Sequence, residues 1–76
     1  MTNLVCVEEK LDSTYSVMIV SRNDVWDCYG MKTDEMGETP YMYMFGLPQD
    51  QTPDIREAVK IALANVKEYD DMFDGD

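Results

Sequence analysis

Hydrophobic and polar residues alternate along the first half of the chain, in short stretches separated by turn-forming residues. The clearest case is 15–20, where Tyr15, Val17 and Ile19 fall on one face and Ser16, Met18 and Val20 on the other. A period of two is typical of a strand that buries one face. On this basis the pattern predicts four strands, at residues 4–7, 15–20, 25–31 and 41–45.

A helical pattern follows in the last third of the chain. Apolar residues recur there at spacings of three and four, namely Ile55, Val59, Ala62, Leu63, Val66 and Tyr69. Thr52 is the predicted N-cap, Pro53 the first helical residue, and Asp54 an acid that favours the first turn. Because so short a helix seldom stands alone in water, its stripe must pack on the sheet.

Together these elements predict an α+β fold, in which a four-stranded antiparallel meander packs one C-terminal helix on one face. The sheet is three-stranded if residues 4–7 do not pair. The length of 76 residues predicts a single domain, 1–76, with an acidic tail at 70–76 that frays.

The segment 41–45 is apolar throughout. Strict alternation would place Tyr41, Tyr43 and Phe45 on one face and the two methionines between them on the other. One face then serves the core, and the other either completes the core or forms an interface. We expect the face away from the helix to be lined by Met18, Val20, Trp26, Met42 and Met44.

Composition removes several classes of function. Sixteen acids stand against six bases, without a histidine, for a net charge of −10. Direct binding to nucleic acid or to an anionic membrane is excluded because both would repel the chain. Without histidine the usual general base and the commonest metal ligand are missing, so we expect no enzyme, no metal and no cofactor.

Location and redox state follow from what the N-terminus and the cysteines indicate. Residues 1–6 show no basic region followed by a long apolar run, so we expect no signal peptide and a cytoplasmic protein. Cys6 and Cys28 both lie in apolar stretches, and we interpret them as small, reduced, buried side chains rather than as a redox pair.

The excess charge is not spread evenly along the chain. Residues 53–69 hold three acids and three bases, whereas residues 1–52 hold nine acids and three bases, and residues 70–76 add four acids. In a meander the first and third turns lie at one end of the sheet, and the returning helix finishes there. We therefore predict one acidic pole, made of Glu8, Glu9, Asp12, Asp34, Glu35, Glu38, Glu68, Asp70, Asp71 and Asp74.

Such a pole predicts an interaction protein whose carboxylates, spaced like phosphates, occupy a basic nucleic-acid-binding surface of a partner enzyme. Its size and charge are similar to those of bacteriophage inhibitors of host nucleases or defence effectors, of the anti-CRISPR or anti-restriction type; the site of action would then be the host cytoplasm. Tight binding also needs an apolar anchor. The candidates are Met36, Ile61, Met72 and Phe73.

Two other interpretations remain open at this stage. The acids serve solubility alone in the first. In the second, the protein is a small adaptor or antitoxin-like subunit, which binds a partner or forms a homodimer through the apolar sheet face.

Overall fold

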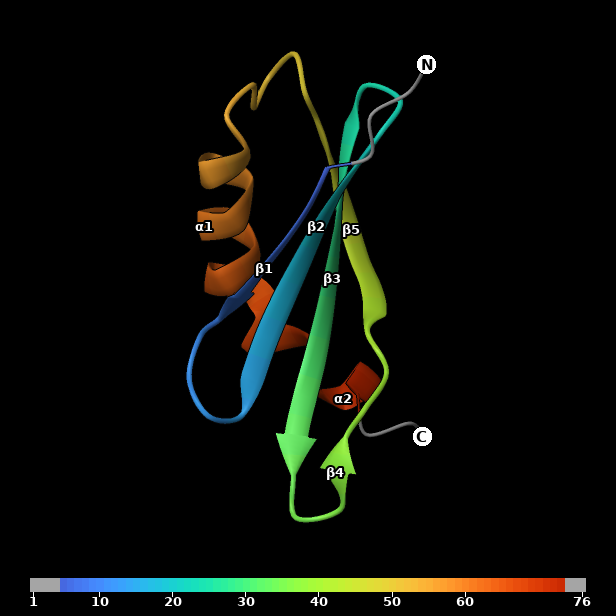
Figure 1. Cartoon of the computed structure of the whole chain (residues 1–76), viewed down its shortest axis with the longest axis vertical. Coiled ribbons are helices and arrows are strands. Elements are labelled where there is room, and N and C mark those ends of the chain that lie inside the picture. Colours follow the sequence, from blue (N-terminus) through green and yellow to red (C-terminus); the bar gives the residue numbers. More distant parts are fainter. Residues whose placement is uncertain (1–4, 74–76) are drawn as a thin grey trace.

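The computed structural model describes residues 5–73, with side chains described for residues 5–71 (Figure 1). The α+β prediction is confirmed, with a curled antiparallel sheet and a C-terminal helix that runs from α-helical into 3-10 geometry. The elements are β1 (Cys6–Lys10), β2 (Tyr15–Arg22), β3 (Val25–Asp34), β4 (Gly37–Glu38), β5 (Met42–Pro48), α1 (Ile55–Asn65), the 3-10 helix η1 (Val66–Tyr69) and α2 (Asp70–Phe73).

The strand β3 is the centre of the sheet. Its residues 25–32 pair with β2, which in turn pairs with β1. On its other side, β3 pairs with β5 over residues 25–30 and with β4 at Thr33 and Asp34. All these pairings are antiparallel, and β1, β2, β3 and β5 follow one another across the sheet as in a meander, while the short β4 pairs with the end of β3.

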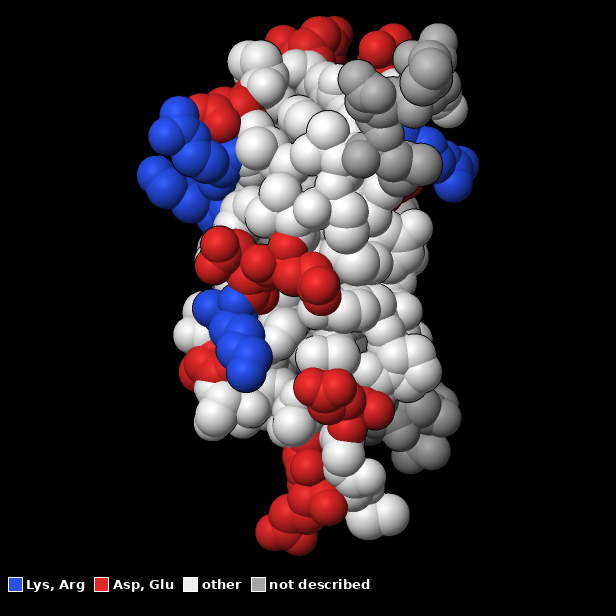
Figure 2. Space-filling model, viewed as in Figure 1, with Lys and Arg blue, Asp and Glu red and all other residues white. Residues whose placement is uncertain are grey.

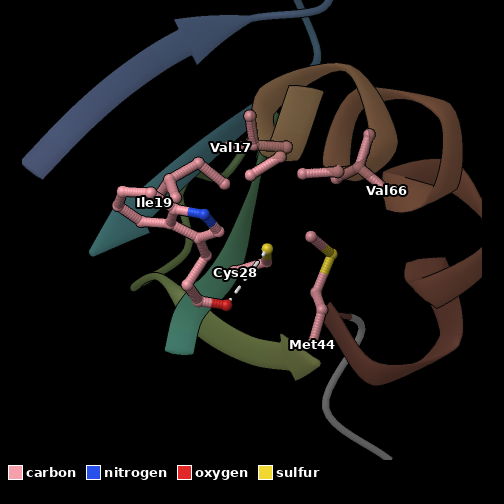
Figure 3. Close-up of a cluster of buried hydrophobic side chains, with 8 residues drawn as sticks. Val17, Ile19, Cys28, Met44 and Val66 are labelled. Carbon is pink, nitrogen blue, oxygen red and sulfur yellow. Dashed lines mark hydrogen bonds between the residues drawn. The ribbon is translucent and has the colours of Figure 1, made fainter. Parts of the chain in front are cut away.

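The core lies between the sheet and α1 (Figure 3). Alternation in β2 and β3 directs Val17, Ile19 and Cys28 towards the helix, and all three are fully buried. The facing helix positions include Ala58 and Ala62, whose small side chains let the helix approach the sheet closely. Val66 closes this cluster at the end of α1.

Strand β5 departs from the predicted alternation. Cys28 pairs with Phe45 but Tyr29 pairs with Tyr43, so Met44 is an additional residue on β5 and forms a β-bulge. The bulge turns both Met44 and Phe45 towards the helix, whereas Tyr43 lies on the opposite face. The expectation that Tyr41, Tyr43 and Phe45 share a face is therefore wrong.

The face of the sheet away from α1, here called the outer face, also differs from expectation. Trp26 and Met44 are buried in the core and Met42 packs against it, so these three residues do not line the outer face. Met18 and Val20 do lie there, because along β2 they alternate with Val17 and Ile19, whose side chains face the helix. The outer face is consequently less apolar than predicted.

The start of α1 is two residues later than predicted. Asp54 is the N-cap, and its Oδ1 accepts the backbone N–H of Arg56 at 3.0 Å. Thr52 does not cap the helix because the chain is still turning there: its carbonyl accepts the indole N–H of Trp26 at 2.6 Å. This bond fastens the connection between β5 and α1 to the middle of the sheet.

The predictions for the two cysteines and for the acidic tail have different outcomes. Cys28 is buried as predicted, but Cys6 is exposed because β1 is the edge strand, and both thiols are free. In the tail, residues 70–73 form α2, while 74–76 lie outside the described residues. The fraying of the tail stays a prediction.

Candidate functional site

The meander sorts the connections between elements into two groups at opposite ends of the molecule (Figure 1). The β1–β2 connection, the β3–β4 hairpin and the helical segments η1 and α2 lie at one end, here called the lower end. The β2–β3 turn and the β5–α1 connection lie at the other, here called the upper end. The first and third turns and the end of the helix are thus together, as the sequence analysis assumed.

Acidic side chains are visible at both ends of the molecule (Figure 2), but their surroundings differ. At the upper end, Asp27 lies 3.7 Å from the Arg22 guanidinium and Asp54 lies 3.0 Å from that of Arg56. The Arg56 hydrogen bond holds the pKa of Asp54 below its usual value. These two upper-end acids are neutralised locally, whereas Asp24 and Asp50 at the same end have no ion-pair partner among the described residues.

Two of the predicted pole residues have local structural roles. Asp12 accepts the backbone N–H groups of Tyr15 at 2.9 Å and Thr14 at 2.8 Å, which shapes the β1–β2 connection and lowers the pKa of Asp12. Asp70 lies 2.9 Å from the Lys32 ammonium, which lowers the pKa of Asp70. Both carboxylates therefore stabilise the lower end instead of projecting from it.

The other described pole residues have no ion-pair partner within residues 5–71. Neutralisation at the lower end is thus confined to the lysines near Asp12 and Asp70. Asp74 lies outside the described residues. The described members of the predicted pole without an ion pair are Glu8, Glu9, Asp34, Glu35, Glu38, Glu68 and Asp71.

The β3–β4 hairpin carries the most prominent of these acids. The Asp34 Oδ1 accepts the backbone N–H of Met36 at 2.9 Å, and Gly37, with φ of 113°, completes a turn that other residues rarely adopt. This turn leaves Met36 94% exposed at the tip, next to Glu35.

The base of the hairpin is held to β3 by Thr39. The Thr39 backbone N–H donates to the Lys32 carbonyl at 2.9 Å, and the Thr39 Oγ1 accepts the Lys32 backbone N–H at 3.0 Å. Since the two contacts fix the hairpin from the side of β3, its acids and Met36 are presented on an ordered scaffold.

The remaining anchor candidates are less informative. Ile61 is half-buried on α1, and the side chains of Met72 and Phe73 lie outside the described residues. On the outer face Tyr43 is 49% exposed, and its ring meets that of Tyr29 edge to face with centroids 5.6 Å apart. This aromatic pair is the most exposed apolar feature of the described outer face.

A cavity of about 240 Å³ is a feature that the sequence analysis missed. Tyr41, which precedes β5, reaches across the outer face to β1, where its hydroxyl donates to the Glu8 carboxylate at 3.2 Å. Burial, together with the Glu8 and Glu38 charges, raises the pKa of Tyr41 to about 12. No signal in the sequence links Tyr41 to Glu8, because 33 residues separate them.

Comparison of the chain with protein-family models, with curated proteins and with solved structures finds no match. No helix among the described residues is long and apolar enough to cross a membrane. Within the same part of the chain, no group of three or more acidic, cysteine or histidine side chains is placed to hold a metal ion.

Proposed function

We propose that this protein is an inhibitor that binds a basic, nucleic-acid-binding surface of a partner enzyme through its lower end and so excludes DNA or RNA from that surface. The observation that supports the proposal is the β3–β4 hairpin. Asp34, Glu35 and Glu38 have no ion-pair partner among the described residues and surround Met36, which is almost fully exposed.

Exposed carboxylates and an exposed thioether have complementary roles in such an interface. Unpaired charges steer a basic partner and orient the encounter, but an apolar anchor at the centre of the contact supplies most of the affinity. Methionine suits this role because its flexible thioether side chain adapts to the surface that it meets. The hydrogen bonds of Asp34 and Thr39 order the hairpin before binding, which reduces the entropy lost in the complex.

The proposal extends to the class of partner. A small, strongly acidic inhibitor of a nuclease or of a CRISPR or restriction effector is of value to a bacteriophage, and the site of action is then the host cytoplasm. Neither nucleic acid nor membrane is a direct ligand, because a net charge of −10 opposes both. In this role the protein acts by occlusion and not as an enzyme.

Capture from a bacterial lysate tests the proposal. The tagged protein is washed at about 0.1 M and then about 0.5 M salt, and each eluate is identified by mass spectrometry. The salt range shortens the Debye length from about 10 Å to about 4 Å, so a complex governed by charge weakens strongly. We expect a nucleic-acid-processing enzyme in the high-salt eluate, and its activity should fall in proportion to added protein.

A pair of triple variants assigns the binding to the lower end. Asp34→Asn, Glu35→Gln and Glu38→Gln together should weaken the complex about tenfold or more, which corresponds to about 1.4 kcal/mol. The matched control is Asp24→Asn, Asp50→Asn and Glu57→Gln, which removes the same charge from exposed positions elsewhere. Equal affinities of the two triple variants would contradict the proposal.

A second function is supported by the exposed Tyr43 and the Tyr29 ring beside it. In this alternative the protein is an adaptor or antitoxin-like subunit that binds a partner, or a second copy of itself, through the outer face. Association would then resist salt and be abolished by Tyr43→Glu, whereas the lower-end triple variant would leave it unchanged. Sedimentation at the two salt concentrations distinguishes this alternative from the inhibitor.

A further inference from the structure

The cavity on the outer face has a floor made by one rung of the sheet. Ser16 of β2 pairs with Lys10 of β1 on one side and with Met31 of β3 on the other. Because directly opposed residues in an antiparallel sheet point to the same face, the three side chains lie together beneath the cavity, and all three line it.

Ser16 is unusual among these residues. Its side chain belongs to a residue that is only 5% exposed, yet its hydroxyl has no hydrogen-bond partner among residues 5–71. The hydroxyl oxygen is not fully enclosed by protein, so it can bond to water or to a group that enters the cavity. Since Ser16 points away from the core and into the cavity, a protein partner for its hydroxyl would lie in the cavity.

The charged residues that line the cavity indicate the charge of a group that would bind there. Glu8, Glu9 and Glu38 line it, against the single lysine, Lys10, of the described lining. The Tyr41 hydroxyl stays protonated because its pKa is raised to about 12, so it adds no negative charge and keeps the Glu8 carboxylate oriented. The surplus is negative, which favours a cation.

The volume of the cavity and its apolar lining indicate the shape of the group that would bind there. A volume of about 240 Å³ is below the range of about 300–1,000 Å³ that is usual for whole small-molecule ligands. The Met31 side chain and the Tyr41 ring offer apolar surface next to the carboxylates. A long aliphatic stem that ends in a positive charge fits both properties, and an aromatic ring is a favourable neighbour for a cation.

We propose that this cavity receives a cationic side chain, lysine or arginine, of a partner protein. The charged head lies between the carboxylates of Glu8 and Glu38, its donors satisfy the Ser16 hydroxyl oxygen, and its stem lies against Met31 and Tyr41. The origin of the cation in a basic partner rests on the proposed function, but the chemistry of the cavity does not.

Small probes test the cavity without the partner. Acetyl-lysine amide and acetyl-arginine amide are titrated into the isotope-labelled protein, with acetyl-norleucine amide as the uncharged control, and amide chemical shifts are followed. We expect saturable shifts centred on Ser16, Met31 and Tyr41 with one or both cationic probes and none with the control. The probe that binds more tightly tells lysine from arginine.

Variants separate a built cavity from general attraction to an acidic protein. Glu8→Gln with Glu38→Gln should weaken probe binding at least about fivefold, whereas Glu57→Gln with Asp71→Asn, which removes the same charge elsewhere, should leave it within about twofold. Ser16→Ala should weaken binding about two- to fivefold. Shifts that do not saturate, or equal losses in the two double variants, overturn the inference.

The two proposals fail in different ways. If the probes saturate the cavity but the lower-end triple variant binds its partner as well as the control does, the cavity stands and the docking of the hairpin is wrong. If the triple variant loses the partner and no probe saturates, the docking stands and the cavity inference is wrong.

Discussion

The two ends of this small domain carry similar chemistry but use it differently. At the upper end Asp27 and Asp54 each face an arginine, and the Trp26 indole fastens the β5–α1 connection to the sheet. At the lower end a hairpin projects acids that have no ion-pair partner in the described chain, with Met36 exposed among them.

The difference shows that acidity alone is a poor indicator of function. Asp12 was assigned to the acidic pole by its position, yet it has a clear structural role as a turn residue. Glu35 and Glu38 have neither an ion pair nor a turn to maintain among the described residues. A carboxylate whose repulsion is left uncompensated in a marginally stable domain is the better candidate for binding.

The largest expected difference in stability is between a variant of Trp26 and a variant of Met36. Trp26→Ala should cost about 3–5 kcal/mol because it empties a large core position and frees the Thr52 carbonyl. Met36→Ala should leave stability within about 0.5 kcal/mol, since its side chain contacts solvent. Urea unfolding followed by circular dichroism measures both variants.

Trp26→Phe is the variant to measure if Trp26→Ala does not fold. It keeps an aromatic ring in the core but removes the indole N–H, so we expect a smaller loss, about 1–3 kcal/mol. Equal free energies of unfolding for Met36→Ala and Trp26→Phe would contradict the contrast between an upper end that is bonded to the sheet and a lower-end hairpin that is exposed to solvent.

A medium effect is expected at the two turns. Gly37 has open space for a Cβ but a φ of 113°, so Gly37→Ala should strain the hairpin by about 1–3 kcal/mol. Asn23 in the upper turn has φ of 49°, and Asn23→Gly should be tolerated. Because β4 is short and pairs with only two residues of β3, the strain should open the hairpin locally, which hydrogen exchange of the Thr39 amide detects as faster exchange, with a smaller loss of global stability.

The smallest effect concerns charge. Glu35→Gln with Glu38→Gln should raise stability, by less than about 1 kcal/mol, because it relieves repulsion between exposed acids. Asp54→Asn should lower it, because it removes the ion pair with Arg56. Thermal unfolding at neutral pH compares these variants with the parent, and a rise for Asp54→Asn would contradict the assignment.

The pH dependence of the last variant has a defined sign. The hydrogen bond and charge of Arg56 hold the folded-state pKa of Asp54 below the ordinary value of an aspartate, so its contribution to stability is complete above about pH 5 and is lost as pH falls through the folded pKa. The parent and Asp54→Asn should therefore converge in strong acid. A difference that persists there would show that the ion pair is not its cause.

Periodicity predicted the order of strands and helix because burial of one face dominates both β2 and α1. It failed at β5, where the bulge inserts Met44 and reverses the faces of the residues that precede it. A bulge depends on pairing with a distant strand and leaves no mark in an apolar run. The cap was misplaced for a similar reason: Thr52 is bonded to Trp26, which is 26 residues away.

The candidate site was likewise predictable only in part. The grouping of the β1–β2 connection and the β3–β4 hairpin at one end was predictable from the meander, because turn order alone determines it. Which acids have partners depends on side-chain geometry, and the predicted roles of Asp12 and Asp70 changed accordingly. The cavity required the reach of Tyr41 over the sheet to Glu8, which no local pattern encodes.

The order of the sheet and α1 along the chain has a consequence for biosynthesis. A chain leaves the ribosome N-terminus first, so the strands emerge before the helix that covers them. Until Ala58 and Ala62 arrive, the sheet presents Val17 and Ile19 to water. The nascent sheet is therefore vulnerable to aggregation until α1 has emerged, and fast docking of α1 is what protects it.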